Sequence, residues 1–128
     1  MGLLLDSHTL LWWFTGDASL PSTARRRITE SQEPVFVSSA SAWEIAIKLN
    51  LGRLPSAAHL LSNFDHELEL DGFQSLPILA QHGIRAGLLP GPDKDPFDRM
   101  LIAQAQAENL AVVSNDKVFD RYGVRRFW

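Results

Sequence analysis

The chain has 128 residues, no cysteine, and 15 acidic against 12 basic residues, which gives a formal net charge of -3. This length suits one domain with a single core, and the 45% of hydrophobic residues can fill that core. The missing cysteines exclude a disulfide scaffold, an iron–sulfur or thiolate–zinc site and a cysteine nucleophile. The small acidic excess is atypical of a protein that coats nucleic acid.

No part of the chain has the composition of a leader, a linker or a repeat. The first apolar run is interrupted by a charge at Asp6, so it is not typical of a signal peptide. No later apolar run is long enough to cross a bilayer. We therefore expect residues 1–128 to form one domain, located in the cytoplasm and without membrane contact.

Five short runs predict strands. Residues 3–5, 35–37 and 111–113 are continuously apolar, which indicates strands that are buried on both faces, as in a parallel sheet. Residues 73–76 and 124–127 are less regular candidates. All five are short and are separated by helical patterns or loops.

Helical patterns lie between these strands, and the clearest begins at Pro96. Asp95 is expected as its N-cap, and Asp98 in its first turn favours the helix dipole. Strands that alternate with helices predict an α/β fold with a mostly parallel central sheet flanked by helices. The predicted helices cover residues 8–14, 21–31, 41–51, 56–70, 77–88 and 96–109.

Four acidic residues follow these elements at one edge of the predicted sheet. Asp6 directly follows the first strand, and Asp116 lies just beyond the 111–113 strand. Glu44 and Asp98 lie in the first turns of two helices. Ligands of open α/β sheets bind beyond the carboxyl ends of the strands, so we expect these carboxylates to converge there.

Glu44 also has a purely structural interpretation. It would close a capping box that begins at Ser41, or it would pair with Lys48 one turn further along the helix. Asp6 and Asp116 could likewise cap the helical turns that follow them. Taken singly, each acid is compatible with a capping role.

Taken together, the four acids favour a metal site. Two carboxylates about 5 Å apart repel by roughly 3 kcal/mol at an effective dielectric constant of ~20, and a divalent cation would compensate for this. Oxygen ligands without cysteine or a well-spaced histidine pair suit Mg²⁺ or Mn²⁺ rather than zinc. Such ions promote the hydrolysis of phosphodiesters.

At these positions the chain resembles PIN-domain ribonucleases, in particular the toxins of VapBC-type toxin–antitoxin pairs. The resemblance covers nearly the whole chain and implies a Rossmann-like α/β/α fold with Mg²⁺- or Mn²⁺-dependent cleavage of RNA. It is carried by the motifs LLLDSHTLLW at 3–12, VSSASAWEI at 37–45, DPFDRMLIAQA at 95–105 and SND at 114–116, followed by Phe119.

The resemblance also assigns roles to individual residues. Asp6, Asp98 and Asp116 would be the main metal ligands, and Glu44 would bind metal or orient the attacking water. The accessory positions that it implies are Ser7, Asp95 and Ser114. Arg99 is a further candidate because it is next to Asp98, and it would contact phosphate or pair with an acid. The implied partners are an RNA substrate, a cognate VapB-like antitoxin and a second copy in a homodimer.

Several other residues are expected to lie outside this site. Among the aromatic residues 12–14, at least one is expected to be exposed, because three consecutive helical residues cannot all face one core. His82 is interpreted as an ordinary polar position. The basic run 25–27 is interpreted as a solvated helix face, with contact to an RNA backbone as the alternative.

Two other functions remain alternatives at this stage. A receiver-like signalling domain also has an acidic Mg²⁺ pocket, but it needs paired acids after the first strand, where only Asp6 is found. A catalytically silent PIN-like module would bind RNA or protein without cleavage. Assigning four acids to one pocket leaves 11 acidic residues (15 − 4) against 12 basic ones, so the negative total no longer disfavours nucleic acid.

Overall fold

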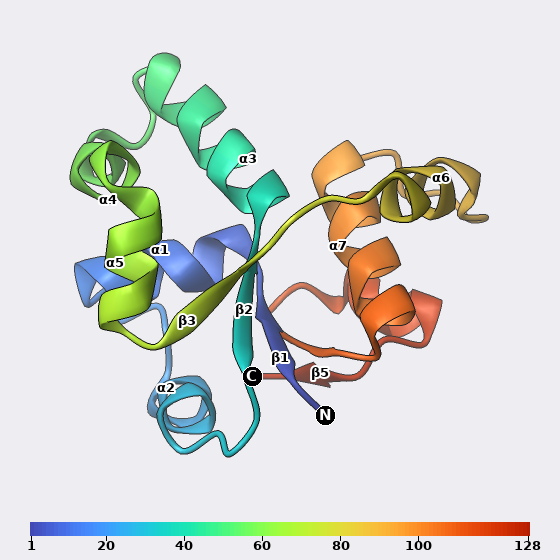
Figure 1. Ribbon diagram of the computed structural model, residues 1–128, viewed down its shortest axis with the longest axis horizontal. Helices are drawn as coiled ribbons and strands as arrows, with labels where there is room; N and C mark the ends of the chain where they lie inside the picture. The colour runs from blue at the N-terminus through green and yellow to red at the C-terminus, as the bar shows by residue number, and fades with distance from the viewer.

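A five-stranded parallel sheet forms the centre of the computed structural model, which describes all residues from Met1 to Trp128 (Figure 1). Its strand order is β3-β2-β1-β4-β5, and every neighbouring pair is parallel. This confirms the predicted α/β fold, including the two less regular strands. The strands are β1 (Leu3–Leu5), β2 (Val35–Ser38), β3 (Phe73–Leu76), β4 (Ala111–Val113) and β5 (Arg126–Phe127).

Helices cover both faces of this sheet. In Figure 1, α1, α2 and α5 lie on one side of it, and α6 and α7 lie on the other. Two 3-10 helices, η1 (Pro55–Ala57) and η2 (Lys117–Tyr122), complete the chain. The α-helices are α1 (Ser7–Thr15), α2 (Ser22–Thr29), α3 (Ser39–Asn50), α4 (Ala58–Ser62), α5 (Phe64–Leu70), α6 (Ala80–Leu88) and α7 (Pro96–Glu108).

The alternation of side chains along β1 divides the core into two clusters. Leu3 and Leu5 pack with residues of α1 and α2, whereas Leu4 packs with Leu101 and Ile102 of α7. All three leucines of β1 are buried. Because β1 is central and covered on both faces, the residue that follows it lies at the middle of the sheet edge.

The bounds of the observed helices differ from the predicted ones, and α6, for example, begins at Ala80 instead of residue 77. The predicted helix over 56–70 is divided into η1, α4 and α5, and the break between α4 and α5 lies at Asn63, whose backbone is non-helical with φ -150° and ψ 54°. The helix predicted from residue 41 begins at Ser39. Ser38 caps it by accepting a hydrogen bond from the backbone N–H of Ala40 at 3.0 Å.

The expectation of an exposed aromatic residue within 12–14 is wrong, since all three side chains are half-buried. Trp12 packs on Trp128, with ring centres 5.9 Å apart, and Trp13 packs on Phe73 at 5.4 Å. All three side chains pack against the core cluster that contains Leu3 and Leu5. No helix of the structure has both the length and the apolar character needed to cross a bilayer.

His82 is likewise not an ordinary surface position, because its side chain is fully buried. Its Nδ1 accepts a hydrogen bond from the backbone N–H of Leu79 at 3.0 Å, and its Nε2 lies 3.1 Å from Oε1 of Glu108. The imidazole thus joins the start of α6 to the end of α7. Its role is structural, and it lies outside the acidic edge of the sheet.

Candidate active site

The four predicted acids come from four separate elements at the carboxyl edge of the sheet. Asp6 follows β1, and Asp116 follows β4, which pairs with β1 in the register Leu5↔Val113. Glu44 lies on α3 and Asp98 in the first turn of α7. The rings of Trp43 and Phe97, the residues just before these two acids, are in edge-to-face contact at 5.0 Å, so α3 and α7 meet there.

Asp6 and Asp116 are connected through Ser114. The hydroxyl of Ser114 donates a hydrogen bond to Oδ2 of Asp6, and it accepts one from the backbone N–H of Asp116 at 2.9 Å. Oδ1 of Asp6 accepts from the backbone N–H of Thr9 at 2.8 Å, so the expected capping of α1 by Asp6 is observed. The Asp6 carboxylate is 7% exposed and is held at both oxygens.

Glu44 is held by a hydroxyl and an ammonium group. Ser7 donates a hydrogen bond to Oε1 of Glu44 at 2.6 Å, and Nζ of Lys48 lies 3.2 Å from Oε2. The expected pair with Lys48 therefore forms. The alternative capping box does not, because Ser38 caps the helix and the buried hydroxyl of Ser41 has no partner.

Asp98 lies close to several other acidic side chains. Burial, the largest cause, and the nearby charges of Asp95, Asp93 and Asp116 together raise the pKa of its carboxyl to about 8. Asp95 also caps α7 as expected, accepting from the backbone N–H groups of Phe97 at 2.9 Å and Asp98 at 3.4 Å. Several carboxylates thus gather here with little cationic compensation.

The acids do not form a closed metal cage in the structure, since no three acidic or histidine side chains lie close enough to hold one ion together. Asp6 is connected to Asp116 through Ser114, and Glu44 to Ser7, the residue that follows Asp6. Asp98 has no hydrogen bond to Asp116, and the two carboxylates interact only by electrostatic repulsion. The donor set still fits a hard divalent cation, because it consists of oxygens and because the acids around Asp98 disfavour its ionisation unless a cation compensates for the added charge.

Arg99 lies beside Asp98 in sequence, but it contacts neither an acid nor the open side of the site. Its guanidinium group donates to the backbone carbonyls of Ala86 at 3.0 Å, Asp93 at 2.8 Å and Leu89 at 2.5 Å. The alternative interpretation, a pair with an acid, is not observed. Its N–H donors are occupied by carbonyls of α6 and of the loop between α6 and α7. This geometry does not support a contact between Arg99 and a substrate phosphate.

A shallow cavity of about 390 Å³ borders this edge of the sheet. Glu44 and Asp95 contribute charge to it, and Ile47, Leu51 and Phe97 contribute apolar surface. A larger cavity, of about 650 Å³, lies elsewhere and contains none of the four acids. We place the candidate active site at the acids, because the volume of a cavity does not indicate which reaction its side chains can promote.

Comparison with known families decides what kind of domain this is. The family model described as PIN domain matches residues 3–125, which is nearly the whole chain. The chain belongs to the PIN domain family. No curated protein matches it in sequence. Membership in the PIN family does not support the receiver-like alternative.

Solved structures with the same fold come from toxin–antitoxin complexes. VapBC2 from Rickettsia felis, solved with a DNA fragment from its promoter, is 16% identical with a TM-score of 0.65, over 99% of this chain and 98% of that one. VapBC-1 from nontypeable Haemophilus influenzae is 13% identical with a TM-score of 0.66, over 99% and 97%. FitAB bound to the IR36 DNA fragment is 18% identical with a TM-score of 0.59, over 98% and 93%.

Two residues of this PIN domain site are missed by the sequence reasoning. Thr9 is buried and donates through its hydroxyl to the backbone carbonyl of Val113 at 2.8 Å, which joins α1 to the end of β4. Asp93 adds to the repulsion on Asp98. The spacing of Asp93, Asp95 and Asp98 was the available signal for an acidic cluster, whereas nothing in the sequence singles out Thr9.

Proposed function

We propose that this PIN domain is a metal-dependent endoribonuclease that acts in the cytoplasm as the toxin of a VapBC-type toxin–antitoxin pair. The observation that carries the proposal is the accumulation of carboxylates around Asp98, whose pKa of about 8 reflects burial and three neighbouring acids. Membership in the PIN family supports nuclease activity. The choice of RNA and of Mg²⁺ or Mn²⁺ is part of the proposal.

Asp6, Asp98 and Asp116 would hold the divalent ions. When bound, Mg²⁺ or Mn²⁺ would lower the pKa of a coordinated water and stabilise charge on the phosphoryl and leaving oxygens. Ser114 fixes Asp6 by a hydrogen bond to one oxygen, which leaves that carboxylate little rotational freedom. Asp116 is placed by the same serine through its backbone N–H.

Glu44 would orient the attacking water. Ser7 holds Oε1 of this carboxylate at 2.6 Å, and Lys48 lies 3.2 Å from Oε2. The Glu44 side chain is therefore directed by contacts from α1 and from its own helix. The attack would occur in line with the departing 3′ oxygen of the RNA and would leave a 5′ phosphate on the product.

A cognate antitoxin is the proposed partner. The cavity of about 390 Å³ beside Glu44 and Asp95 offers apolar contacts from Ile47, Leu51 and Phe97. An amphipathic antitoxin segment would pack on these side chains and direct a basic group toward the acids. The VapBC and FitAB complexes among the similar structures support this assignment, and a homodimer of the toxin is proposed with it.

The test is cleavage of labelled RNA by the purified chain with Mn²⁺, with Mg²⁺ and with EDTA. We expect cleavage in both metals, none in EDTA, and products with 5′ phosphate and 3′ hydroxyl ends. Asp6→Asn and Asp98→Asn should abolish cleavage with the fold retained, whereas the exposed Asp65→Asn should remain active. RNA binding without cleavage under every metal condition would favour the silent module instead.

A further inference from the structure

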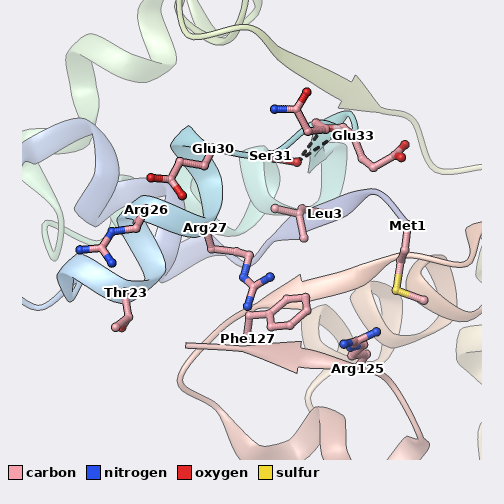
Figure 2. Close-up of a pocket in the computed structure, with 11 residues that line it drawn as sticks. Met1, Leu3, Thr23, Arg26, Arg27, Glu30, Ser31, Glu33, Arg125 and Phe127 are labelled. Carbon is pink, nitrogen blue, oxygen red and sulfur yellow. Dashed lines mark hydrogen bonds between the residues drawn. The ribbon is translucent and has the colours of Figure 1, made fainter.

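The largest cavity of the structure is not used by the proposed nuclease mechanism (Figure 2). It has a volume of about 650 Å³ and reaches Leu3, at the amino end of β1, whereas Asp6 follows the carboxyl end of that strand. Arg26 and Arg27 of α2 line it together with Arg125, which precedes β5. We call these three side chains and the space between them the arginine cavity.

One aromatic ring positions two of the three guanidinium groups. Cζ of Arg27 lies 3.8 Å from the centre of the Phe127 ring, and Cζ of Arg125 lies 5.1 Å from it. Stacking of this kind uses the face of a guanidinium group and leaves its N–H edges available. Figure 2 shows the Arg27 side chain directed over the Phe127 ring.

None of the three arginines has a polar partner within the protein. The ion pairs of the structure involve other residues, although Glu30 and Glu33 also line the cavity. The arginine side chains that do form hydrogen bonds are Arg85, Arg99 and Arg126. The arginine cavity thus presents several unpaired cationic donors in positions fixed by packing.

The lining of the cavity favours a phosphate-bearing ligand over a peptide. Only three of its 11 lining residues are hydrophobic, and the neutral ones include Thr23, Ser31 and Gln32. A docked peptide takes most of its affinity from apolar anchors, which this lining hardly accommodates. A guanidinium fork, by contrast, matches the spacing of two phosphate oxygens.

We propose that the arginine cavity binds a backbone phosphate of single-stranded RNA, at a position beyond the bond that is cut. This inference rests on the proposed ribonuclease function for its choice of RNA. Leu3, which lines the cavity, and Asp6 are three positions apart, roughly 10 Å along the strand. Only an RNA of several nucleotides would reach both places, so the cavity would favour long substrates over short ones.

The test is the affinity of the full chain for a labelled RNA of about 20 nucleotides, measured by fluorescence anisotropy in EDTA. The variants are Arg125→Ala and the double variant Arg26→Ala/Arg27→Ala. We expect the double variant to bind roughly tenfold more weakly, and the slope of log affinity against log salt to fall by about 0.7 per arginine removed. Glu30→Gln should have the opposite effect and strengthen binding.

Arg25→Ala is the matched control, because Arg25 is on the same helix and carries the same charge, but stacks on Trp13 at 5.3 Å and does not line the cavity. Arg27→Lys keeps the charge and loses the planar fork, so we expect intermediate affinity. The melting temperature of every variant separates lost binding from lost folding. Equal affinity of Arg125→Ala and Arg25→Ala, which remove one charge each, would overturn the proposal, as would binding of labelled polyglutamate without binding of RNA.

Cleavage measured separately in Mn²⁺ distinguishes this inference from the function on which it rests. We expect the double variant to cut an RNA of about 4 nucleotides as fast as the unaltered chain, and to show a raised KM only with the longer RNA. Binding in EDTA does not depend on catalysis, so absence of cleavage would reject the ribonuclease proposal alone. Normal cleavage with unchanged KM and affinity in the double variant would reject the arginine cavity alone.

Discussion

The hydroxyl of Ser114 donates a hydrogen bond to Oδ2 of Asp6, although the two residues lie 108 positions apart in the chain. The contact follows from the pairing of β1 with β4, in which Leu5 is the partner of Val113 and the next residues meet beyond the strand ends. It connects the first acid of the site to the loop that carries the last. Removal of the Ser114 hydroxyl should therefore affect both Asp6 and Asp116.

Ser114→Ala should weaken both the fold and the metal site. The variant leaves Oδ2 of the buried Asp6 and the backbone N–H of Asp116 without their hydroxyl partner, at a cost of about 1–3 kcal/mol. We expect a lower melting temperature and weaker Mn²⁺ binding by calorimetry. Ser114→Thr retains the hydroxyl and should recover most of the metal affinity. An alanine variant with unaltered Mn²⁺ affinity would show that Ser114 does not position Asp6.

Lys48→Met should strengthen the binding of divalent metal. The Lys48 ammonium group lies 3.2 Å from Glu44, so it competes with a cation for that carboxylate and repels it. The stability cost of losing this i,i+4 pair should be small, about 0.3–0.5 kcal/mol. Calorimetric titration with Mn²⁺ measures the gain, and Arg85→Met on α6 serves as the control. Weaker binding in Lys48→Met would contradict the assignment of Glu44 to the metal site.

Asp98→Asn should stabilise the metal-free protein at high pH. Burial and the neighbouring acids raise the pKa of Asp98 to about 8 from the ordinary value of 3.8, so the folded state retains a proton that the unfolded state has lost. The resulting destabilisation grows as pH rises from about 4 to 8 and is complete above the folded-state pKa.

Melting temperatures in EDTA at pH 5 and at pH 8.5 test whether the ionisation of Asp98 destabilises the folded protein. The difference between the asparagine variant and the unaltered chain should be small at the lower pH and should favour the variant at the higher one. Addition of Mn²⁺ should reverse the order at high pH, because only the unaltered chain would gain stability from the ion. Identical pH dependence in the two proteins would refute a raised pKa at Asp98.

Arg99→Met should destabilise the fold rather than weaken RNA binding. Its guanidinium group holds the carbonyls of Ala86, Leu89 and Asp93, and a thioether leaves these acceptors without their donor. We expect a loss of about 2–3 kcal/mol in the free energy of unfolding. Arg99→Lys should recover only part of it, because one ammonium group cannot reach three carbonyls at once. A stable Arg99→Met with a raised KM for RNA would instead indicate a phosphate contact.

The sequence predicts the fold well, because strands that are buried on both faces consist of continuous runs of apolar residues. Short, continuously apolar runs such as Leu3–Leu5 indicate strands covered on both faces, and parallel pairing then brings Asp6 and Asp116 to one edge. Local chemistry is predicted equally well where it involves near neighbours. The capping of α7 by Asp95 and the contact of Glu44 with Lys48 are both of this kind.

Contacts between distant segments could not be predicted in the same way. The hydrogen bond from Ser7 to Glu44 spans 37 positions and depends on how α1 and α3 pack. The orientation of Arg99 depends on carbonyls of a loop whose path no periodicity describes. His82 is buried because α6 packs on α7, a contact that its polar character does not indicate.

The position of β4 in the sheet has a consequence for when the proposed nuclease can act. β4 is the fourth strand in sequence but pairs with β1 in the centre of the sheet, and Asp116 follows it. A chain that is still being synthesised on the ribosome therefore lacks one of the two partners of β1, and the last acid of the site, until residues 111–116 have emerged. Under the proposed function, the topology delays cleavage activity until β4 and Asp116 have been synthesised and have joined β1.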